Sequence, residues 1–447
     1  MLPVAPTILG GTVSAAVAPG DLESRSEILK VATASLIGTS IEWYDFFLYN
    51  TAAALVFNKL FFPTFAPLAG TIAAFTTYAV GFMARPIGGL VFGHYGDRHG
   101  RKTMLYLTLA MMGAATTAIG LLPTYAAIGI WAPILLVGLR VVQGLGIGGE
   151  WGGAVLMAVE HAPAHRRGFY GSWPQMGVAI GLLLSTLAFR YVSGLPGATF
   201  LGWAWRVPFL LSFILLAVGL WIRHRVAESP VFDRLKRLGA EARTPVVDVF
   251  SHYARPLLLA TGARLAENGL FYIFTTFSLT YVATQLKLNR DIALNGLLMA
   301  SIVSLVTVPT WGATSDRVGR RPVYLAGAVV CGILAFPFFW LLDTGRPTLI
   351  ALALVLAISL GHDAMYAPQS TFFAELFDTR VRYSGASLGS QLGAAVSGGL
   401  SPLIATALLA RAGGKSWPVS IYMLTLVVIT IVSVSLARET HRRAIDD

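Results

Sequence analysis

The sequence predicts an all-α membrane protein in which twelve transmembrane helices form two six-helix bundles, with both termini in the cytoplasm. Three observations lead to this fold. First, 55% of the 447 residues are hydrophobic and only 12% are charged, whereas a soluble chain carries about 25% charged residues. Second, apolar stretches of about 20 residues or more, enough to cross a bilayer as a helix, recur along the chain. Third, two polar signatures occur twice in the same order, which indicates a duplicated half.

The elements follow in chain order. A cytoplasmic tail covers residues 1–30, and its first 20 residues hold no Lys or Arg, so we expect no cleavable signal. The first bundle covers 31–224, a cytoplasmic linker 225–254, the second bundle 255–437 and a tail 438–447. The twelve predicted spans are 31–57, 68–93, 104–122, 131–158, 168–192, 205–224, 255–284, 292–313, 322–342, 348–374, 383–410 and 417–437.

The distribution of Lys and Arg predicts the orientation. With cytoplasmic termini, the inner segments hold 22 of these residues, the outer loops 8 and the spans 3, as the positive-inside rule requires. The net charge of +11 therefore belongs to the loops of a multi-pass membrane protein, and nucleic-acid binding is excluded. We expect the protein to lie in a bacterial-type inner membrane. The single cysteine, Cys331, lies in an apolar run, so we expect neither a disulfide framework nor a thiolate metal site.

Two loop signatures are duplicated. Residues 93–102 and 312–321 both read G-x-x-x-D-R-x-G-R-K/R and stand 219 residues apart. Glu160 precedes a basic pair and Gly168, and Glu375 likewise precedes Arg382 and Gly385. An Asp followed closely by Gly and two basic residues at a helix end is suited to capping that helix and bridging to a neighbour. Small residues also recur at every fourth position of spans four and eleven, which favours close helix packing.

Ionisable residues inside the spans are the candidate proton-coupling groups. Carboxylates at membrane depth are expensive and persist where they hold a proton, meet a cation or face water. Three arginines also lie within spans, so five acids face three bases, and the excess predicts at least one protonated carboxyl. The acids are Glu42, Asp45, Glu150, Glu267 and Asp363.

Several of these groups also have purely structural interpretations. Glu42 and Asp45 share one helix face near the midplane, and form either a proton site or a patch that fixes helix packing. Glu267 is three residues from Arg264, so a local ion pair accounts for these two charges inside the span as well as a functional site does. The sequence leaves open a structural bridge between Glu150 and an arginine of span two, and a packing role for Asp363.

A buried guanidinium binds a carboxylate with two parallel hydrogen bonds, so the span arginines predict an organic-acid substrate. Arg85 and Arg140 are the leading candidates and Arg264 the third. Aromatic and amide groups on the same helices are candidates for closing around a hydroxylated ring, although ordinary packing is the alternative for each. They are Tyr44, Trp173, Gln175, Asn268, Tyr272, His362, Tyr366, Gln369 and Gln391.

The duplicated loop, the twelve spans and the central linker resemble the major facilitator superfamily over nearly the whole chain. The finer pattern is similar to its metabolite:proton symporter family, and within it to the branch that transports shikimate. The matching stretches are 42–46 (EWYDF), 81–86 (GFMARP), 140–153 (RVVQGLGIGGEWGG), 205–209 (WRVPF), 132–137 (APILLV), 362–363 (HD) and 382–386 (RYSGA). The resemblance implies that Asp97, Arg101, Asp316 and Arg320 latch the cytoplasmic side while the carrier faces outward.

The resemblance implies proton-coupled uptake of a small organic acid, with shikimate or a related hydroxylated ring acid as substrate. Protons would be the coupling ion, with no cofactor or metal, and we expect a monomer in the lipid bilayer. Other metabolites (2-oxoglutarate, citrate, proline or betaine) and a facilitative carrier or exporter remain alternatives. So does a membrane sensor or an enzyme, although we find no Walker loop, His-Glu-x-x-His or Gly-x-Ser-x-Gly motif.

Overall fold

The structure, a computed structural model, describes residues 19–63, 67–225, 228–238 and 243–441. These residues are helical almost throughout and form no β-strand. The first 18 residues of the predicted N-terminal tail and the last six of the predicted C-terminal tail lie outside the described residues.

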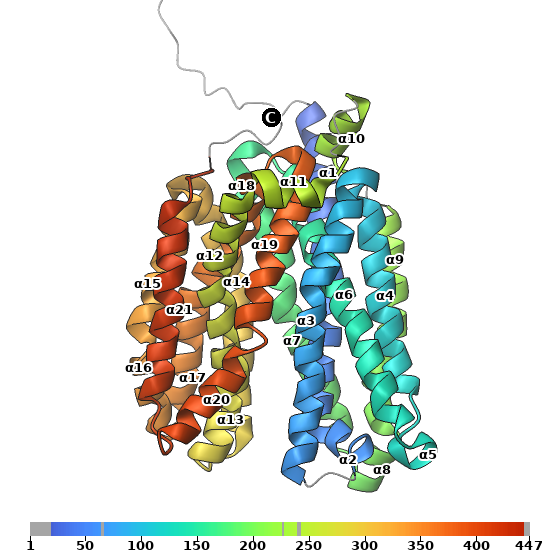
Figure 1. Cartoon of the computed structure of the whole chain (residues 1–447), viewed down its shortest axis with the longest axis vertical. Helices are drawn as coiled ribbons and strands as arrows, with labels where there is room; N and C mark the ends of the chain where they lie inside the picture. Colours follow the sequence, from blue (N-terminus) through green and yellow to red (C-terminus); the bar gives the residue numbers. More distant parts are fainter. Residues whose placement is uncertain (1–18, 64–66, 226–227, 239–242, 442–447) are drawn as a thin grey trace, which may run out of the picture.

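The first half of the chain forms one bundle (Figure 1). Its long helices stand side by side, and short helices join them. The elements are α1 (Pro19–Ala52), η1 (Ala53–Phe57), α2 (Asn58–Leu60), α3 (Pro67–His99), α4 (Arg101–Leu121), α5 (Tyr125–Ile128), α6 (Trp131–Glu160), η2 (Ala164–Arg166), α7 (Arg167–Ser193), α8 (Gly197–Gly202), η3 (Ala204–Arg206) and α9 (Val207–His224).

The second half forms the other bundle, drawn in yellow to red in Figure 1. Its elements are α12 (Ala254–Tyr272), η4 (Ile273–Phe277), α13 (Ser278–Thr280), η5 (Tyr281–Gln285), α14 (Arg290–Val318), α15 (Arg320–Leu334), α16 (Pro337–Asp343), α17 (Pro347–Val355), η6 (Leu356–His362), α18 (Asp363–Leu376), η7 (Thr379–Val381), α19 (Arg382–Ser397), α20 (Ser401–Arg411) and α21 (Trp417–Leu436).

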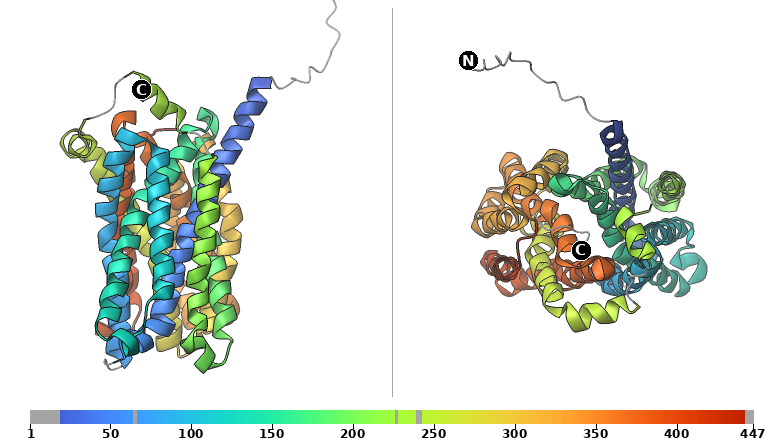
Figure 2. Two further views of the ribbon diagram at one scale, coloured as in Figure 1. Left: turned by 90° about the vertical axis from the view of Figure 1, so that its right-hand side faces the viewer. Right: turned by 90° about the horizontal axis from the view of Figure 1, so that it is seen from above.

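Two short helices, α10 (Pro230–Arg237) and α11 (Pro245–His252), lie in the segment that joins the bundles. Both sit at the end of the molecule where α1 begins and α21 ends (Figures 1 and 2). We call this end, which the charge distribution predicts to be cytoplasmic, the inner end, and the opposite end the outer end. The helix α1 extends beyond the predicted start of the first span, since it begins at Pro19.

Eight of the described helices are long and apolar enough to cross a membrane, or nine if the bent pair α15–α16 is one span. The other three predicted spans fall on α1, α3 and the stretch from α12 to η5, which run alongside the rest in Figure 1. Large apolar side chains such as Phe213, Leu258 and Leu403 are exposed on the outside, whereas charged residues are buried inside. This distribution is the one expected when hydrocarbon surrounds the protein.

Wide helical turns interrupt the first long helix of each bundle. The π-helical segment η1 follows α1, and η4 and η5 follow α12, in each case near the outer end. A third site, η6, leads into α18. Such turns are rare and occur mostly at functional sites.

The bundles meet along two pairs of helices, with α3 beside α19 and α7 beside α14. Within the first bundle, α3 and α6 pack backbone to backbone. A Cβ atom on Gly144 would lie 2.3 Å from the carbonyl oxygen of Gly81, and one on Gly148 would lie 2.1 Å from that of Arg85. Small residues in span four thus bring α6 against the helix that carries Arg85, as the sequence predicts.

Candidate functional site

Two buried arginines of the first bundle share one aromatic ring. Arg85 on α3 and Arg140 on α6 are 3% and 1% exposed. The central guanidinium carbons lie 4.7 Å and 5.0 Å from the ring centroid of Phe46 on α1. Arg85 also stacks 3.9 Å from Phe82, and Arg140 lies 4.2 Å from Tyr49. These cation–π contacts orient both guanidinium groups.

Asp45 on α1 is fully buried and accepts hydrogen bonds only from neutral hydroxyls in the part of the chain that is described. Thr116 on α4 donates at 2.9 Å and Ser212 on α9 at 2.5 Å. The amide nitrogen of Gln143 donates to Thr116 at 2.7 Å, and its oxygen accepts from Arg140 at 3.1 Å. Asp45 is therefore connected to a candidate substrate arginine through two neutral side chains rather than by an ion pair.

Glu42 lies one turn away on the same face of α1. It is buried, and its Oε2 has no hydrogen-bond partner among the described residues. The charges of Arg85, Arg223 and Glu150 all act on it. A buried carboxyl with one unpartnered oxygen, acted on by charges of both signs, is suited to exchanging a proton.

Glu150 forms its ion pair with Arg223 of α9, and not with Arg85, the bridge that the sequence left open. Thr108 donates to the same carboxylate at 2.9 Å. Arg223 also donates to the carbonyl oxygen of Leu105. Arg223 was missed from the sequence because it stands at the end of span six, where we counted it with the basic residues of the inner segments.

The second bundle holds its own polar network. Arg264 and Glu267, one turn apart on α12, form a salt bridge of 2.9 Å. His362 contacts Glu267 through Nε2 at 3.1 Å and Asp363 through Nδ1 at 3.1 Å. Thr307 on α14 donates to Asp363 at 2.6 Å. The local pair anticipated between Arg264 and Glu267 thus exists, but it is part of a larger network.

Gln369 on α18 connects this network to a further tyrosine. Its amide nitrogen donates to Glu267 at 3.0 Å and lies 2.7 Å from the hydroxyl of Tyr324. Its oxygen accepts from Arg264. Gln175 on α7 crosses between the bundles, since it accepts from Trp151 at 3.1 Å and donates to the carbonyl oxygen of Tyr366 at 3.0 Å.

Aromatic rings bring the two polar regions together. Tyr272 of α12 lies 5.4 Å from Phe82 and 6.5 Å from Phe46, edge to face, so it reaches the rings on which the arginines stack. Tyr366 stacks on His362 at 5.0 Å. Sequence reasoning missed Phe46 and Phe82, because an aromatic residue in an apolar helix carries no signal that separates it from ordinary packing.

A cavity adjoins the network of the second bundle and opens between α7, α12, α14 and α18. Its polar lining includes Gln175, His362, Asp363 and Tyr366, three of which we proposed as substrate contacts. Apolar side chains from α7 and α14 complete its wall. The cavity thus places hydrogen-bonding groups beside aromatic and aliphatic side chains where the two bundles face each other.

The other four candidate substrate residues make contacts of their own. The hydroxyl of Tyr44 donates to the carbonyl oxygen of Pro208, which commits it to packing of α1 against α9. Trp173 packs with Phe169 and Tyr170 on α7. Asn268 faces the backbone at Gly398, and Gln391 lies against Gly89 of α3.

Two aspartates bind the opposite bundle at the inner end. The carboxylate of Asp97 on α3 accepts from the backbone N–H groups of Tyr383 and Ser384, at 3.1 and 2.9 Å, at the start of α19. The carboxylate of Asp316 on α14 accepts from those of Gly168 and Phe169, at 2.7 and 2.9 Å, at the start of α7. Each anion thus meets a positive helix N-terminus of the other bundle. We call them the Asp97 latch and the Asp316 latch.

Arginines and a second pair of acids surround the latches. Arg101 lies 3.7 Å from Asp97 and 3.5 Å from Glu160, and Arg382 of the other bundle lies 3.2 Å from Glu160. In the second latch, Arg320 contacts Asp316 at 2.7 Å and Glu375 at 3.3 Å. Both duplicated signatures of the sequence therefore meet at the inner end.

Two glutamates cap the helices that begin beside the latches. Glu228 accepts from the backbone N–H groups of Arg101 and Lys102 at the start of α4. Glu439 accepts from those of Arg320 and Arg321 at the start of α15, at 2.9 and 3.0 Å. Burial opposes ionisation of Glu439, but the backbone donors outweigh it and lower the pKa of this carboxyl. The matching roles of Glu228 and Glu439 were not apparent from the sequence.

Known proteins resemble the chain along almost its entire length. The shikimate transporter of Escherichia coli is 42% identical over 422 residues, which cover 94% of this chain and 96% of that one. An inner membrane metabolite transport protein of the same organism is 40% identical, covering 93% and 95%. A proline/betaine transporter of E. coli is 33% identical, covering 93% and 85%.

Solved structures with a similar fold include a proton:xylose symporter bound to 6-bromo-6-deoxy-D-glucose, with a TM-score of 0.78 at 16% identity. The match covers 95% of this chain and 98% of that one. The model of the Major Facilitator Superfamily matches residues 35–398. The duplicated latches, the two bundles and the transporter relatives agree with that match, and the chain belongs to the major facilitator superfamily of membrane transporters.

Proposed function

We propose that the chain is a proton-coupled symporter that takes up a small organic carboxylate, with shikimate or a related hydroxylated ring acid as its substrate. The carrier would work as a monomer in a bacterial inner membrane, with protons as coupling ion and no other cofactor. The 42% identity to a shikimate transporter supports this substrate class.

One observation carries the proposal. The guanidinium of Arg85 is buried, and its Nε and Nη2 have no hydrogen-bond partner among the described residues. It interacts electrostatically with the buried carboxyl of Glu42, whose Oε2 has no partner there either. A substrate carboxylate would satisfy the guanidinium with two parallel hydrogen bonds. Its negative charge would be balanced if a nearby carboxyl carried a proton, so the two ligands favour each other's binding.

The substrate ring would pack where the bundles face each other. Tyr272 and Tyr366 present aromatic faces from the second bundle, and the polar groups beside the adjacent cavity, Gln175 and His362, offer partners for ring hydroxyls. In the transport cycle, a proton and the acid bind from outside, the bundles rock about the site, the latches release, and both ligands leave inside.

The test is transport by the purified chain in proteoliposomes. An inward proton gradient should drive accumulation of labelled shikimate, and a protonophore should abolish it. A thermal-shift screen of shikimate, quinate, benzoate, citrate, 2-oxoglutarate and proline identifies the substrate class. Accumulation that persists with the protonophore contradicts proton coupling, whereas stabilisation by proline but not by ring acids redirects the substrate assignment.

A further inference from the structure

A column of polar residues runs inside the first bundle from the middle of α1 to the inner end. Glu42 interacts electrostatically with Glu150 and with Arg223, and these two residues form the ion pair described above. The column lies among helices of one bundle, whereas the candidate substrate groups lie where the two bundles meet.

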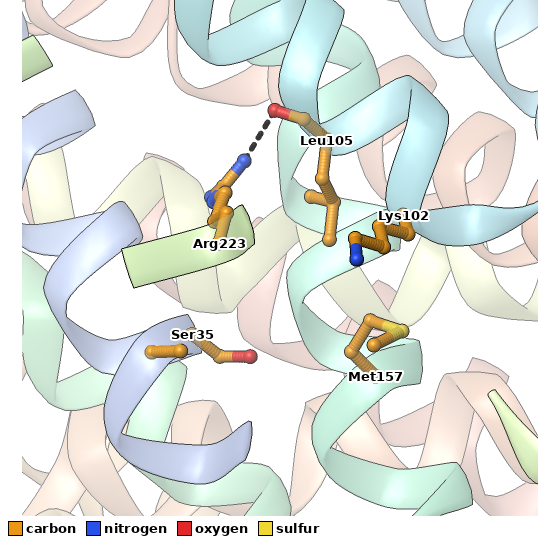
Figure 3. A pocket seen from close by; sticks show the side chains of 6 residues that line it. Ser35, Lys102, Leu105, Met157 and Arg223 are labelled. Atoms are coloured by element: carbon orange, nitrogen blue, oxygen red, sulfur yellow. Dashed lines mark hydrogen bonds between the residues drawn. The ribbon is translucent and has the colours of Figure 1, made fainter. Parts of the chain in front are cut away.

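A pocket adjoins Arg223, and Figure 3 shows this side chain among the others that line it. It is lined by Ala34, Ser35, Lys102, Leu105, Met157 and Arg223, which come from α1, α4, α6 and α9 of the first bundle. Lys102, the second residue of α4, donates through Nζ to the carbonyl oxygen of His224 at 3.2 Å, an exposed contact at the inner end. The pocket thus lies between Arg223 and the inner surface.

We propose that this pocket is the inner mouth of a proton pathway that runs within the first bundle, separate from the substrate path between the bundles. This inference rests on the proposed proton coupling. In the first step, the carboxyl of Glu42 gives its proton to the carboxylate of Glu150. Glu42 becomes anionic, and Arg223 moves toward it from the now neutral Glu150. Glu150 then gives the proton to water in the pocket.

The charges around the pocket disfavour a resident metal cation. Arg223 and Lys102 both line the pocket, and their fixed positive charges repel sodium or potassium. Titratable groups that interact with Glu150 or Arg223 include Glu42, Tyr383 of the second bundle and Tyr106 of α4. The tyrosines are neutral at physiological pH, which leaves the glutamates to exchange the proton.

The pathway also explains how protons leave independently of the latches. The Asp97 and Asp316 latches join the bundles, and their residues are absent from the pocket lining. A proton can therefore be released into the cytoplasm through one bundle while the inner ends of both bundles stay joined.

The test is a substitution that fills the pocket with an apolar side chain and leaves every charged residue in place. Ser35→Leu places an apolar side chain in the pocket, and Ser251→Leu, at an exposed position of α11 at the same end, is the matched control. We expect Ser35→Leu to abolish gradient-driven accumulation and substrate-induced proton uptake into the vesicles, while counterflow of labelled against unlabelled substrate remains. The control should retain all three activities.

Two results with Ser35→Leu would overturn the pathway. One is retained accumulation. The other is loss of counterflow together with accumulation, since the pocket would then serve folding or the substrate path. Glu150→Gln, which cannot accept the proton, should show the same separation of activities. If accumulation by the wild-type protein persists in the presence of a protonophore, the proposed proton-coupled function itself is contradicted. Failure of the pathway and failure of the proposed function are therefore distinguishable.

Discussion

Asp45 and Glu42 lie one turn apart on α1, yet their surroundings differ. Asp45 receives two hydroxyl donors, one of which is linked through Gln143 to Arg140. When Asp45 is ionised, Thr116 donates to it; when Asp45 is protonated, Thr116 is free to donate to the carbonyl oxygen of Met112, with which it already makes a contact of 2.9 Å. A proton on Asp45 therefore changes the acceptor to which Thr116 donates, while the oxygen of Thr116 accepts from Gln143, the partner of Arg140.

The first prediction concerns Asp45→Asn. The amide keeps the shape of the side chain but fixes it in a neutral form, so proton movement is uncoupled from transport. We expect uphill accumulation of shikimate in proteoliposomes to be lost, while counterflow persists. Asp291→Asn, on an exposed site at the start of α14, is a suitable control. Accumulation at the wild-type level would remove Asp45 from the coupling scheme.

The second prediction concerns Arg85→Lys. Lysine keeps the charge but cannot donate two parallel hydrogen bonds to a carboxylate or stack flat between Phe46 and Phe82. We expect an affinity loss of about 10- to 100-fold, since a lost charge-assisted hydrogen bond costs about 1.5–3 kcal/mol. Isothermal titration with shikimate measures it. An unchanged dissociation constant would show that the substrate carboxylate binds elsewhere.

The third prediction concerns Gln143→Leu. This change breaks the link between Thr116 and Arg140 without altering any charge. If the link transmits protonation of Asp45, the pH dependence of shikimate affinity should flatten, whereas a purely structural role would lower affinity equally at all pH values. Dissociation constants measured across a pH series decide between the two outcomes.

At the scale of helices, the inner end is held by anions placed at helix N-termini. Asp97 meets the start of α19 and Asp316 the start of α7, each across the bundle boundary. Glycines make this approach possible. A Cβ atom on Gly93 would lie 2.8 Å from the Cα atom of Ser384, and one on Gly312 would lie 2.6 Å from the carbonyl oxygen of Gly168. The first Gly of each duplicated loop is therefore needed for contact as much as the Asp.

The fourth prediction concerns Asp316→Asn. The substitution removes the negative charge that faces the start of α7 and leaves Arg320 with one carboxylate fewer, so the closed inner end loses about 1–3 kcal/mol. We expect the population of inward-open carriers to rise. Distances between spin labels on exposed residues at the inner ends of α4 and α15 should report it. Distance distributions identical to wild type would show that the latch does not hold this end.

Much of this architecture could be predicted from the sequence. The apolar stretches match the observed helices, and the duplicated loops contain the aspartates that join the bundles. Orientation of individual side chains was less predictable. The hydroxyl of Tyr44 reaches the carbonyl oxygen of Pro208 on α9, a contact between distant parts of the chain that a residue pattern cannot predict. Arg223 was missed because a hydropathy pattern cannot distinguish a buried helix end from the start of a loop.

At the scale of the whole molecule, the buried charges nearly balance. The five carboxylates predicted from the sequence are all buried, and Arg223 joins Arg85, Arg140 and Arg264 as a fourth buried arginine in the spans. The excess of acids over bases is thus one rather than two. His362, whose two ring nitrogens both contact carboxylates, balances that excess when it is protonated. One proton then compensates a monovalent substrate anion.

The fifth prediction follows from this balance. Symport of one proton with one carboxylate moves no net charge, so a pH gradient should drive accumulation and a membrane potential alone should not. Each net charge moved would contribute about 2.3 kcal/mol per 100 mV, which makes the distinction measurable. Potassium diffusion potentials imposed with valinomycin at constant pH test it. Accumulation driven by potential alone would require at least two protons per substrate.

The wide turns near the outer end have a mechanical consequence. The segments η1 and η4 interrupt the first long helix of each bundle, and a π-turn can tighten into an α-turn by releasing one residue, which swings the helix tip beyond it. The helix tips at the outer end can then bend without breaking charged contacts, whereas the two bundles can separate at the inner end only after charged contacts break. One gate is governed by stiffness and the other by electrostatics, so salt and pH should affect the inner gate far more than the outer one.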